Sequence, residues 1–245
     1  MKRTAPLALA GLAACATPYA PTPYDREAAQ VRRIAMMDDA LPERAGAYQA
    51  TSTGQNVASS TAAASPIGGL VVGLVVAGAE AKVASDRRGK IAHALEAAGY
   101  DPEAALERSL DEALEAAGYD VTLTGEARRK RALRDAYPAP GDADAVLDVV
   151  AVSFGYMKTG GAQPWRPHAN VHVRLVDAAD PTVILMDNRV AYNPLGTPEN
   201  VIVVPADPAF AFETVDEMKE APEKTRDGLQ HAVDSVAATV GTLLK

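Results

Sequence analysis

DAVLDVVAVSFGYM, residues 144–157, is the stretch that decides the fold, because it is apolar on both faces through much of its length. Strands with this pattern lie in the middle of a sheet and are covered on both sides. We therefore predict a central strand over 144–157, around which the flanking elements are arranged.

Two further strands follow the central one, over 168–178 (HANVHVRLVDA) and 182–193 (TVILMDNRVAYN). The first alternates an apolar face with a polar face that carries His168, Asn170, His172 and Arg174. The second places Ile184, Met186, Val190 and Tyr192 on one side. Because the link DAADP is short, the two strands should form an antiparallel hairpin.

The chain closes with a predicted amphipathic helix. Its apolar positions recur at three- and four-residue spacing and form one stripe, made of Leu229, Val233, Val236, Val240 and Leu243. A helix with such a stripe packs on one face of a sheet.

The octapeptide ALEAAGYD occurs twice, at 94–101 and 113–120. In both copies the glycine, Gly99 or Gly118, is placed to end a helix in the left-handed conformation. After the first copy, Asp101 and Pro102 have the pattern that starts a new helix. After the second, DVTLTG has the alternation of a strand. The same stop signal precedes different elements and no third copy exists, so the chain is not a repeat array.

Upstream, the segment 30–37 (QVRRIAMM) suits a strand or a short helix, and we favour a strand because Pro42 and Gly46 follow closely. Residues 51–66 are small, polar and aperiodic, as in a loop. The apolar run 67–79 is shorter than the ~20 residues of a spanning helix. We expect a buried helix there; entry into a membrane or an oligomer interface is the other option.

This order of elements predicts the α+β class: a mostly antiparallel sheet of four to five strands, helices on one face, and a C-terminal amphipathic helix. We expect one domain over 30–245. With LEAAGYDVTL (114–123), DADAVLDVVAVSFGY (142–156) and the hairpin, the region of about 100–240 resembles the TolB N-terminal domain and CsgG-like envelope lipoproteins, and departs from them in the glycine-rich helix that precedes it. The resemblance implies a binding or assembly role near the outer membrane, and no catalytic residue.

The N-terminus has the form of a signal peptide. Lys2 and Arg3 precede a short apolar run, and LAAC, ending at Cys15, resembles the bacterial lipobox. The resemblance implies that residues 1–14 are removed and that Cys15 carries diacylglycerol and an acylated amine, with palmitate as a typical chain. The alternative is an ordinary secretory signal whose cleavage site happens to include Cys15.

The residues after the cysteine bear on location. Ala16 occupies the position where an aspartate retains enterobacterial lipoproteins at the inner membrane, so the resemblance implies the outer membrane, periplasmic face. Pro18, Pro21 and Pro23 favour an extended tether, which we place over 15–29.

Charge excludes one class of partner. The chain has 24 basic and 32 acidic residues, a net charge of -8. Removing Lys2 and Arg3 with the signal peptide leaves 22 basic against 32 acidic, or -10. Nucleic-acid binding needs a basic face, so we expect no such partner. The run RRKR at 128–131 fits a solvated helix face better. With one cysteine, the chain forms no internal disulfide.

Patterns for catalysis are absent from the sequence. It holds no GxSxG and no phosphate-binding glycine loop, and Ser153 lies in an apolar strand without a pattern around it. His168 and His172 are four apart on a strand, about 13 Å, too far to share an ion, and we expect both to face solvent. We therefore predict no catalytic residue, no metal and no cofactor.

The best candidate for partner binding is the link 158–168, KTGGAQPWRPH. It holds the chain's one tryptophan, Trp165, with Lys158 and Arg166 nearby, and Trp and Arg are frequent at interface hot spots. Alternatively, Trp165 covers the end of the core. A second candidate is the long apolar loop 193–212.

Together these features predict a lipid-anchored outer-membrane lipoprotein whose periplasmic domain binds another envelope component. The sequence leaves the oligomeric state open. The alternative is a lipid-anchored hydrolase of an envelope polymer.

Overall fold

The computed structural model of the chain describes residues 19–38, 45–49, 79–125, 132–137, 141–160, 162–196 and 198–245. The predicted signal peptide, Cys15, the loop 51–66, most of the apolar run 67–79 and the run 128–131 lie outside these ranges. The helices are α1 (Arg26–Ala29), α2 (Ala79–Ala97), α3 (Pro102–Ala116), η2 (Pro208–Phe210), α4 (Val215–Glu220) and α5 (Pro222–Leu243). The strands are β1 (Arg33–Met36), β2 (Gly46–Gln49), β3 (Asp120–Leu123), β4 (Ala145–Lys158), β5 (Arg166–Asp177), β6 (Ile184–Tyr192) and β7 (Ile202–Val204).

The described strands form one seven-stranded sheet in the order β3-β1-β4-β5-β6-β7, with β2 also paired to β4. The predicted central strand is confirmed as β4, which has β5 on one edge and both β1 and β2 on the other. The predicted hairpin is confirmed as β5 and β6, which pair antiparallel with Val171 opposite Val190.

The sheet is mixed, so the prediction of a mostly antiparallel sheet of four to five strands is wrong. β1 pairs parallel with both β3 and β4, β2 pairs parallel with β4, and β7 pairs parallel with β6. Parallel neighbours need a crossover connection. Between β1 and β3 the chain passes through α2 and α3, which lets β1 and β3 run in the same direction.

A glycine pair lets β2 approach β4 closely. Gly155 is in the left-handed half of the backbone map, with φ +141°, and a Cβ on it would meet the backbone oxygen of Gly46 at 2.1 Å. A glycine inside a strand often marks such a close backbone approach. The glycine at 155 therefore explains how a four-residue strand is held at this end of β4.

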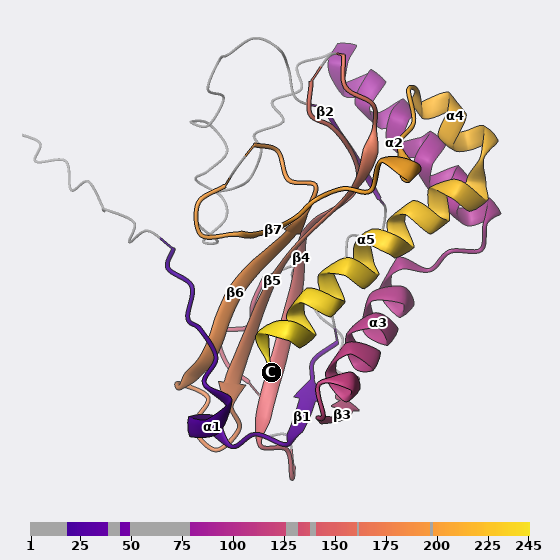
Figure 1. Cartoon of the computed structure of the whole chain (residues 1–245). Helices are drawn as coiled ribbons and strands as arrows, with labels where there is room; N and C mark the ends of the chain where they lie inside the picture. The colour runs from indigo at the N-terminus through magenta and orange to yellow at the C-terminus, as the bar shows by residue number, and fades with distance from the viewer. Residues whose placement is uncertain are drawn as a thin grey trace, which may run out of the picture.

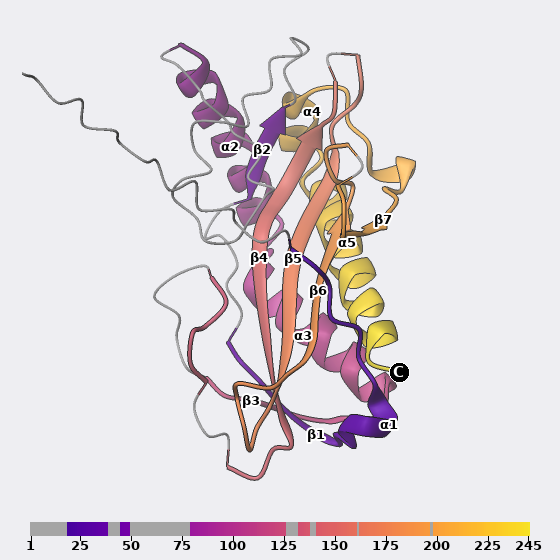
Figure 2. The ribbon, with the colours of Figure 1, turned by 90° about the vertical axis from the view of Figure 1, so that its left-hand side faces the viewer.

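Helices α2, α3 and α5 cover one face of the sheet (Figures 1 and 2), an arrangement that agrees with the α+β class. The stop signals work as predicted: Gly99 and Gly118 have φ of +61° and +88°. The side chain of Asp101 accepts hydrogen bonds from the first amides of α3 and caps that helix. The second copy leads into β3, as expected for one device used before two different elements.

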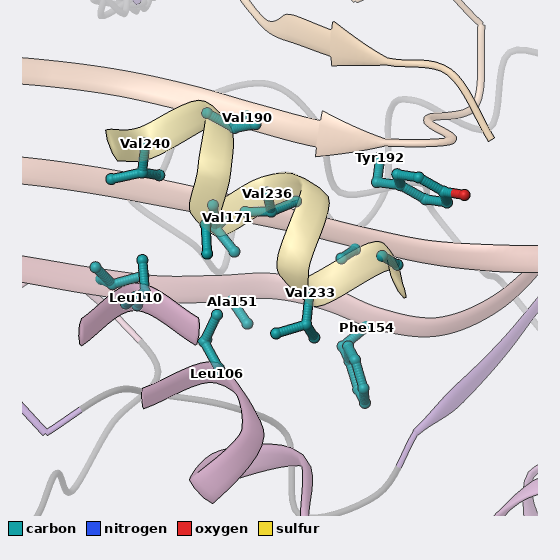
Figure 3. Close-up of a cluster of buried hydrophobic side chains, with 14 of the residues drawn as sticks. Leu106, Leu110, Ala151, Phe154, Val171, Val190, Tyr192, Val233, Val236 and Val240 are labelled. Carbon is teal, nitrogen blue, oxygen red and sulfur yellow. The ribbon is translucent and has the colours of Figure 1, made fainter. Parts of the chain in front are cut away.

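The main core lies between these helices and the sheet (Figure 3). Four members of the predicted stripe on α5, namely Leu229, Val233, Val236 and Val240, are 0–2 % exposed. At the end of the helix, Leu244 is buried in place of Leu243. Facing the helices, the sheet contributes Ala151, Phe154, Val171, Val190 and Tyr192.

Candidate functional site on the polar face of the sheet

The face of the sheet opposite α3 and α5 is polar along β4, β5 and β6. Register places Asp148, Arg174 and Asp187 side by side, one on each strand, and His172 opposite Arg189 one pair further along. Successive side chains alternate between faces, so these residues point away from the main core. This polar face consists of Asp148, Ser153, His168, Asn170, His172, Arg174, Asp187 and Arg189.

The polar face is buried, and the expectation that its histidines face solvent is wrong. His168 and His172 are 2 % and 4 % exposed, and Asp148 and Asp187 are 0 % and 6 % exposed. Charges taken out of water need paired, hydrogen-bonded partners. We therefore expect each charged side chain of this buried face to have a hydrogen-bonded partner.

Asp187 is the centre of the charged network. One carboxylate oxygen lies 2.5 Å from Nε2 of His172, and the other accepts from Nε of Arg174 at 2.8 Å and from Nη2 at 2.7 Å. Burial by itself raises the pKa of Asp187, but the hydrogen bonds and charges of His172 and Arg174 outweigh it and leave the pKa below its usual range. Asp187 is therefore held as a carboxylate.

Asp148 lies at the β4 end of the same row. Its carboxylate accepts the hydroxyl of Tyr137 at 3.0 Å and the backbone amide of Arg134 at 2.9 Å. The segment 132–137 is thereby bound to the polar face. Two segments distant in sequence use this face, because the N-terminal residues are bound to it as well.

Tyr19 lies on the polar face. Its ring packs edge-on against His172, with centroids 5.5 Å apart, and the guanidinium of Arg189 lies 4.0 Å from the ring centroid. The hydroxyl donates to the backbone oxygen of Asp187 at 3.1 Å. Aromatic and cation–π contacts of this kind hold a chain segment in place.

The residues after Tyr19 extend the edge of β6. Thr22 and Asp187 exchange backbone hydrogen bonds of 2.8 and 3.0 Å, as in a pair of antiparallel strands. Asn188 donates from its side chain to the oxygen of Thr22 at 3.3 Å, and Asn200 donates to the oxygen of Tyr19 at 2.8 Å. The segment is bound through its backbone as well as through its side chains.

From there the chain passes around the edge of the sheet to the helix side. Tyr24 packs against the main core, and Arg26 in α1 donates to the oxygen of Ala117 at 2.9 Å while lying over the ring of Tyr119. Residues 19–29 therefore pack against the domain, although the prolines of this segment predicted an extended tether over 15–29. The packed part of the chain reaches at least to Tyr19.

Ser153 and His168 form a pair on the polar face that the sequence pattern did not indicate. Ser153 Oγ lies 2.6 Å from Nε2 of His168, and Nδ1 of His168 lies 2.9 Å from the backbone oxygen of Asn193. A carbonyl only accepts, so Nδ1 carries the proton in the neutral ring and Nε2 accepts from the serine. Burial lowers the pKa of His168 to about 4, so the ring is neutral at pH 7.

This pair has part of the geometry of a serine nucleophile and its base. A register shift between Ala151 and Ser153 directs the serine toward His168, and bulges often have this effect. The third position differs, because Nδ1 donates to a backbone carbonyl and not to a carboxylate. The pair therefore lacks the acid that would stabilise a charged imidazole during catalysis.

The predicted binding residue Trp165 is 3 % exposed. It exchanges backbone hydrogen bonds of 2.7 and 2.9 Å with Phe212, and the guanidinium of Arg87 lies 5.6 Å from its ring centroid. Trp165 thus joins the β4–β5 turn to α2 and to the segment after η2. The alternative given with the prediction, a tryptophan that covers the end of the core, accounts for this burial.

Lys158 and Arg166 stand at the two ends of the same turn and are half-buried. Both residues are close to Trp165 in sequence. Unlike the buried Trp165, they keep part of their side chains exposed. The described part of the second candidate, 193–212, contains β7 and η2. The backbone amide of Asp207 in this segment donates to the hydroxyl oxygen of Tyr192 at 2.7 Å.

A hollow of about 570 Å³ lies between α1, β1 and β3, lined by Arg26, Arg33, Asp144 and their neighbours. Arg33 pairs with Asp142 and Asp144, both at 3.0 Å, and its hydrogen bonds lower the pKa of Asp144 to about 2. Of the charged residues that line this hollow, Arg33 and Asp144 pair with each other, and Arg26 donates to the backbone oxygen of Ala117.

No three His, Cys, Asp or Glu side chains in the described part of the chain gather as the ligands of a metal ion would. None of the described helices combines the length and the apolar character needed to cross a membrane.

The polar positions of 168–178 were visible in the sequence, and so was the same alternation at Asp187 and Arg189. Opposite charges on neighbouring strands of a predicted hairpin could have indicated a paired network. The burial of this network could not be predicted from local pattern, because Tyr19, which covers it, lies 168 residues from Asp187 in sequence.

Comparison with solved structures gives three matching chains, and two of them are described here. The chain is similar to a protein of the PelC dodecamer from Paraburkholderia phytofirmans, with 14 % identity, a TM-score of 0.39, and coverage of 92 % of this chain and 94 % of the other. It is also similar to a candidate lipoprotein from Caulobacter crescentus, with 17 % identity, a TM-score of 0.29, and coverage of 64 % and 94 %. No family model and no curated protein matches the chain. Both TM-scores are below 0.5, so neither structure assigns a function to this chain.

Proposed function

We propose that the chain is an envelope lipoprotein: residues 1–14 are removed, Cys15 is acylated, and the domain is held at the periplasmic face of the outer membrane, where it binds another envelope component. The observation that carries the proposal is the position of Tyr19. Four residues after the proposed lipid site, the chain is already bound to the sheet by side-chain and backbone contacts.

This arrangement suits an anchored domain. Two or three acyl chains give an effectively permanent anchor, since each buried methylene contributes ~0.8 kcal/mol. A force on the lipid acts directly on Tyr19 and Thr22, which are attached to β6 in the sheet. The N-terminal segment is thus built into the domain that it would anchor.

For the partner, we propose contact at the β4–β5 turn through Lys158 and Arg166, with Trp165 as the buried base that holds the turn. The two basic residues stand out in a mature chain of net charge -10. An acidic partner surface fits them. Charge reversal of Lys158 to glutamate should reduce the yield of a crosslinked complex in cells, and Lys82→Glu, an exposed lysine on α2, is the matched control.

Membrane fractionation tests the anchoring directly. Cys15→Ser should leave the protein unprocessed or soluble and absent from the outer-membrane fraction, while Thr17→Ala, which keeps LAAC intact, should fractionate as the wild type does. Equal membrane association of both variants would contradict the proposal.

A second candidate, the lipid-anchored hydrolase, is favoured by one observation, the 2.6 Å contact between Ser153 and His168. An active serine would react with a fluorophosphonate probe, and Ser153→Ala would abolish that labelling. Absence of labelling in the folded wild-type protein would remove this candidate. The missing carboxylate at Nδ1 of His168 makes that the expected result.

A further inference from the structure

The chain between the proposed lipid and the domain is short. From Cys15 to Tyr19 there are four peptide steps, which span at most about 13–14 Å when fully extended. Whatever path these residues take, the lipidated residue lies within that distance of Tyr19. The position of Tyr19 on the domain therefore limits which surface can approach the bilayer.

Tyr19 lies on the polar side of the sheet. Its ring contacts are to His172 and Arg189, which face each other across β5 and β6. Their sequence neighbours Val171 and Val190 point the other way, into the core beneath α5 (Figure 3). Tyr19 and the helices therefore lie on opposite faces of the sheet, which stands in front of α3 and α5 in Figure 2.

The segment from Cys15 to Tyr19 is too short to reach the solvent-facing side of α3 and α5. An α-helix with its side chains is about 10–12 Å thick, so the solvent-facing side of α3 and α5 lies more than one helix diameter beyond the sheet. To place that side on the membrane, residues 15–19 would also have to pass around the edge of the sheet. Their maximum reach of about 13–14 Å is too short for that path.

The charge of the helix layer points the same way. α3 carries one basic residue, Arg108, and five acidic residues: Glu103, Glu107, Asp111, Glu112 and Glu115. An anionic lipid surface repels such a helix. Among the described residues, this acidic helix lies on the side of the sheet opposite Tyr19.

An exposed apolar side chain lies on the same side as Tyr19. Val203 in β7 is 47 % exposed, and its register partner Ala191 is on the polar face of β6, since the neighbouring Val190 faces the core. β7 is also joined to the N-terminal segment, because Asn200, just before it, donates to the oxygen of Tyr19.

We infer that the polar side of the sheet, at Tyr19 and β7, faces a phospholipid bilayer, and that α3 and α5 face away from it. The inference deepens the proposed function and rests on it, because it takes Cys15 as the lipidated residue. It assigns Val203 to the membrane-proximal surface and Glu112 to the surface that a periplasmic partner can reach.

The test uses the lipidated full chain in vesicles of phosphatidylethanolamine and phosphatidylglycerol that contain a lipid-borne quencher. Val203→Cys and Glu112→Cys, both at exposed positions, each take a fluorescent label, since acylation occupies the thiol of Cys15. We expect quenching several-fold stronger at 203 than at 112. Equal quenching at the two sites, stronger quenching at 112, or quenching at neither would overturn the orientation.

Two controls separate the causes. Flotation with the vesicles reports anchoring: a chain that does not float overturns the proposed function and this inference with it, whereas a floating chain with the reverse quenching overturns the orientation alone. A Gly/Ser insertion of about sixteen residues after Thr17 adds ~20 Å of reach. The variant with the insertion should still float with the vesicles, and quenching of the label at 203 should fall. Undiminished quenching would mean that the short segment between Cys15 and Tyr19 does not set the orientation.

Discussion

Tyr19 lies with its ring centroid 4.0 Å from the guanidinium of Arg189, and its hydroxyl donates to the backbone oxygen of Asp187. These contacts join the start of the described chain to β6, the second strand of the hairpin. They bury part of the Tyr19 side chain, and that burial raises the pKa of its hydroxyl above the usual range. The N-terminal segment is thus a structural part of the domain.

Removing the Tyr19 side chain should destabilise the domain. Tyr19→Ala loses a cation–π contact and a hydrogen bond, together worth about 1–3 kcal/mol of unfolding free energy. Tyr19→Phe keeps the ring and should lose about 1 kcal/mol or less. Chemical denaturation of the unlipidated domain measures both. Equal stability of wild type and Tyr19→Ala would mean that the segment does not hold to the sheet.

Asp187 should make stability depend on pH in the acid range. Its pKa is lowered in the folded state, so its contribution is fully present well above the unfolded pKa of about 3.9 and is lost as pH falls through the folded pKa. Asp187→Asn leaves Arg174 and His172 without their carboxylate and should lose about 3–5 kcal/mol at pH 7.

The same variant should flatten the dependence of stability on pH below 5. Unfolding free energies of wild type and Asp187→Asn at a series of pH values check this. Asp86→Asn is a suitable control, because Asp86 is exposed on α2. Parallel curves for wild type and Asp187→Asn would contradict the network.

His168 should titrate far below an ordinary histidine. Its pKa is about 4 when folded, against about 6.5 when unfolded, so the unfolded chain binds the proton first as pH falls. Stability that depends on neutral His168 is present above about pH 6.5 and is lost progressively toward pH 4, by about 2–3 kcal/mol. A titration of imidazole signals by NMR should show one ring that is neutral at pH 5.

Trp165 should contribute to stability as a buried residue. Trp165→Ala opens a cavity where the ring packs beneath Arg87, and such truncations lose about 3–5 kcal/mol. A melting curve paired with the crosslinking yield separates packing from binding. Unchanged stability with a lost crosslink would instead make Trp165 a direct anchor for the partner.

Much of the fold was predictable from local pattern. The continuous apolar run of β4, the alternation in β5 and β6, the caps at Asp101, Gly99 and Gly118, and the stripe on α5 each depend on neighbours in sequence. Parallel pairing was not predictable in this way. β2 and β7 have four and three residues, too few to show a period, and β2 is held by β4, a strand far along the chain.

The polar face was misread for the same physical reason. Alternation in 168–178 correctly separated two faces, but exposure of a face depends on what covers it, and the covering residues Tyr19 and Tyr137 come from other parts of the chain. Trp165 shows the same dependence on distant residues. The sequence left open whether it binds a partner or covers the end of the core, and in the structure Phe212 and Arg87 enclose it.

The mass of the mature N-terminal peptide, purified from the native membrane, tests the lipid anchor most directly. We expect a peptide that begins at Cys15 and carries a diacylglyceryl group on the thiol and an acyl chain on the amine. A mature protein that begins at another residue, or a Cys15 with a free thiol, would contradict the lipid anchor and everything that rests on it.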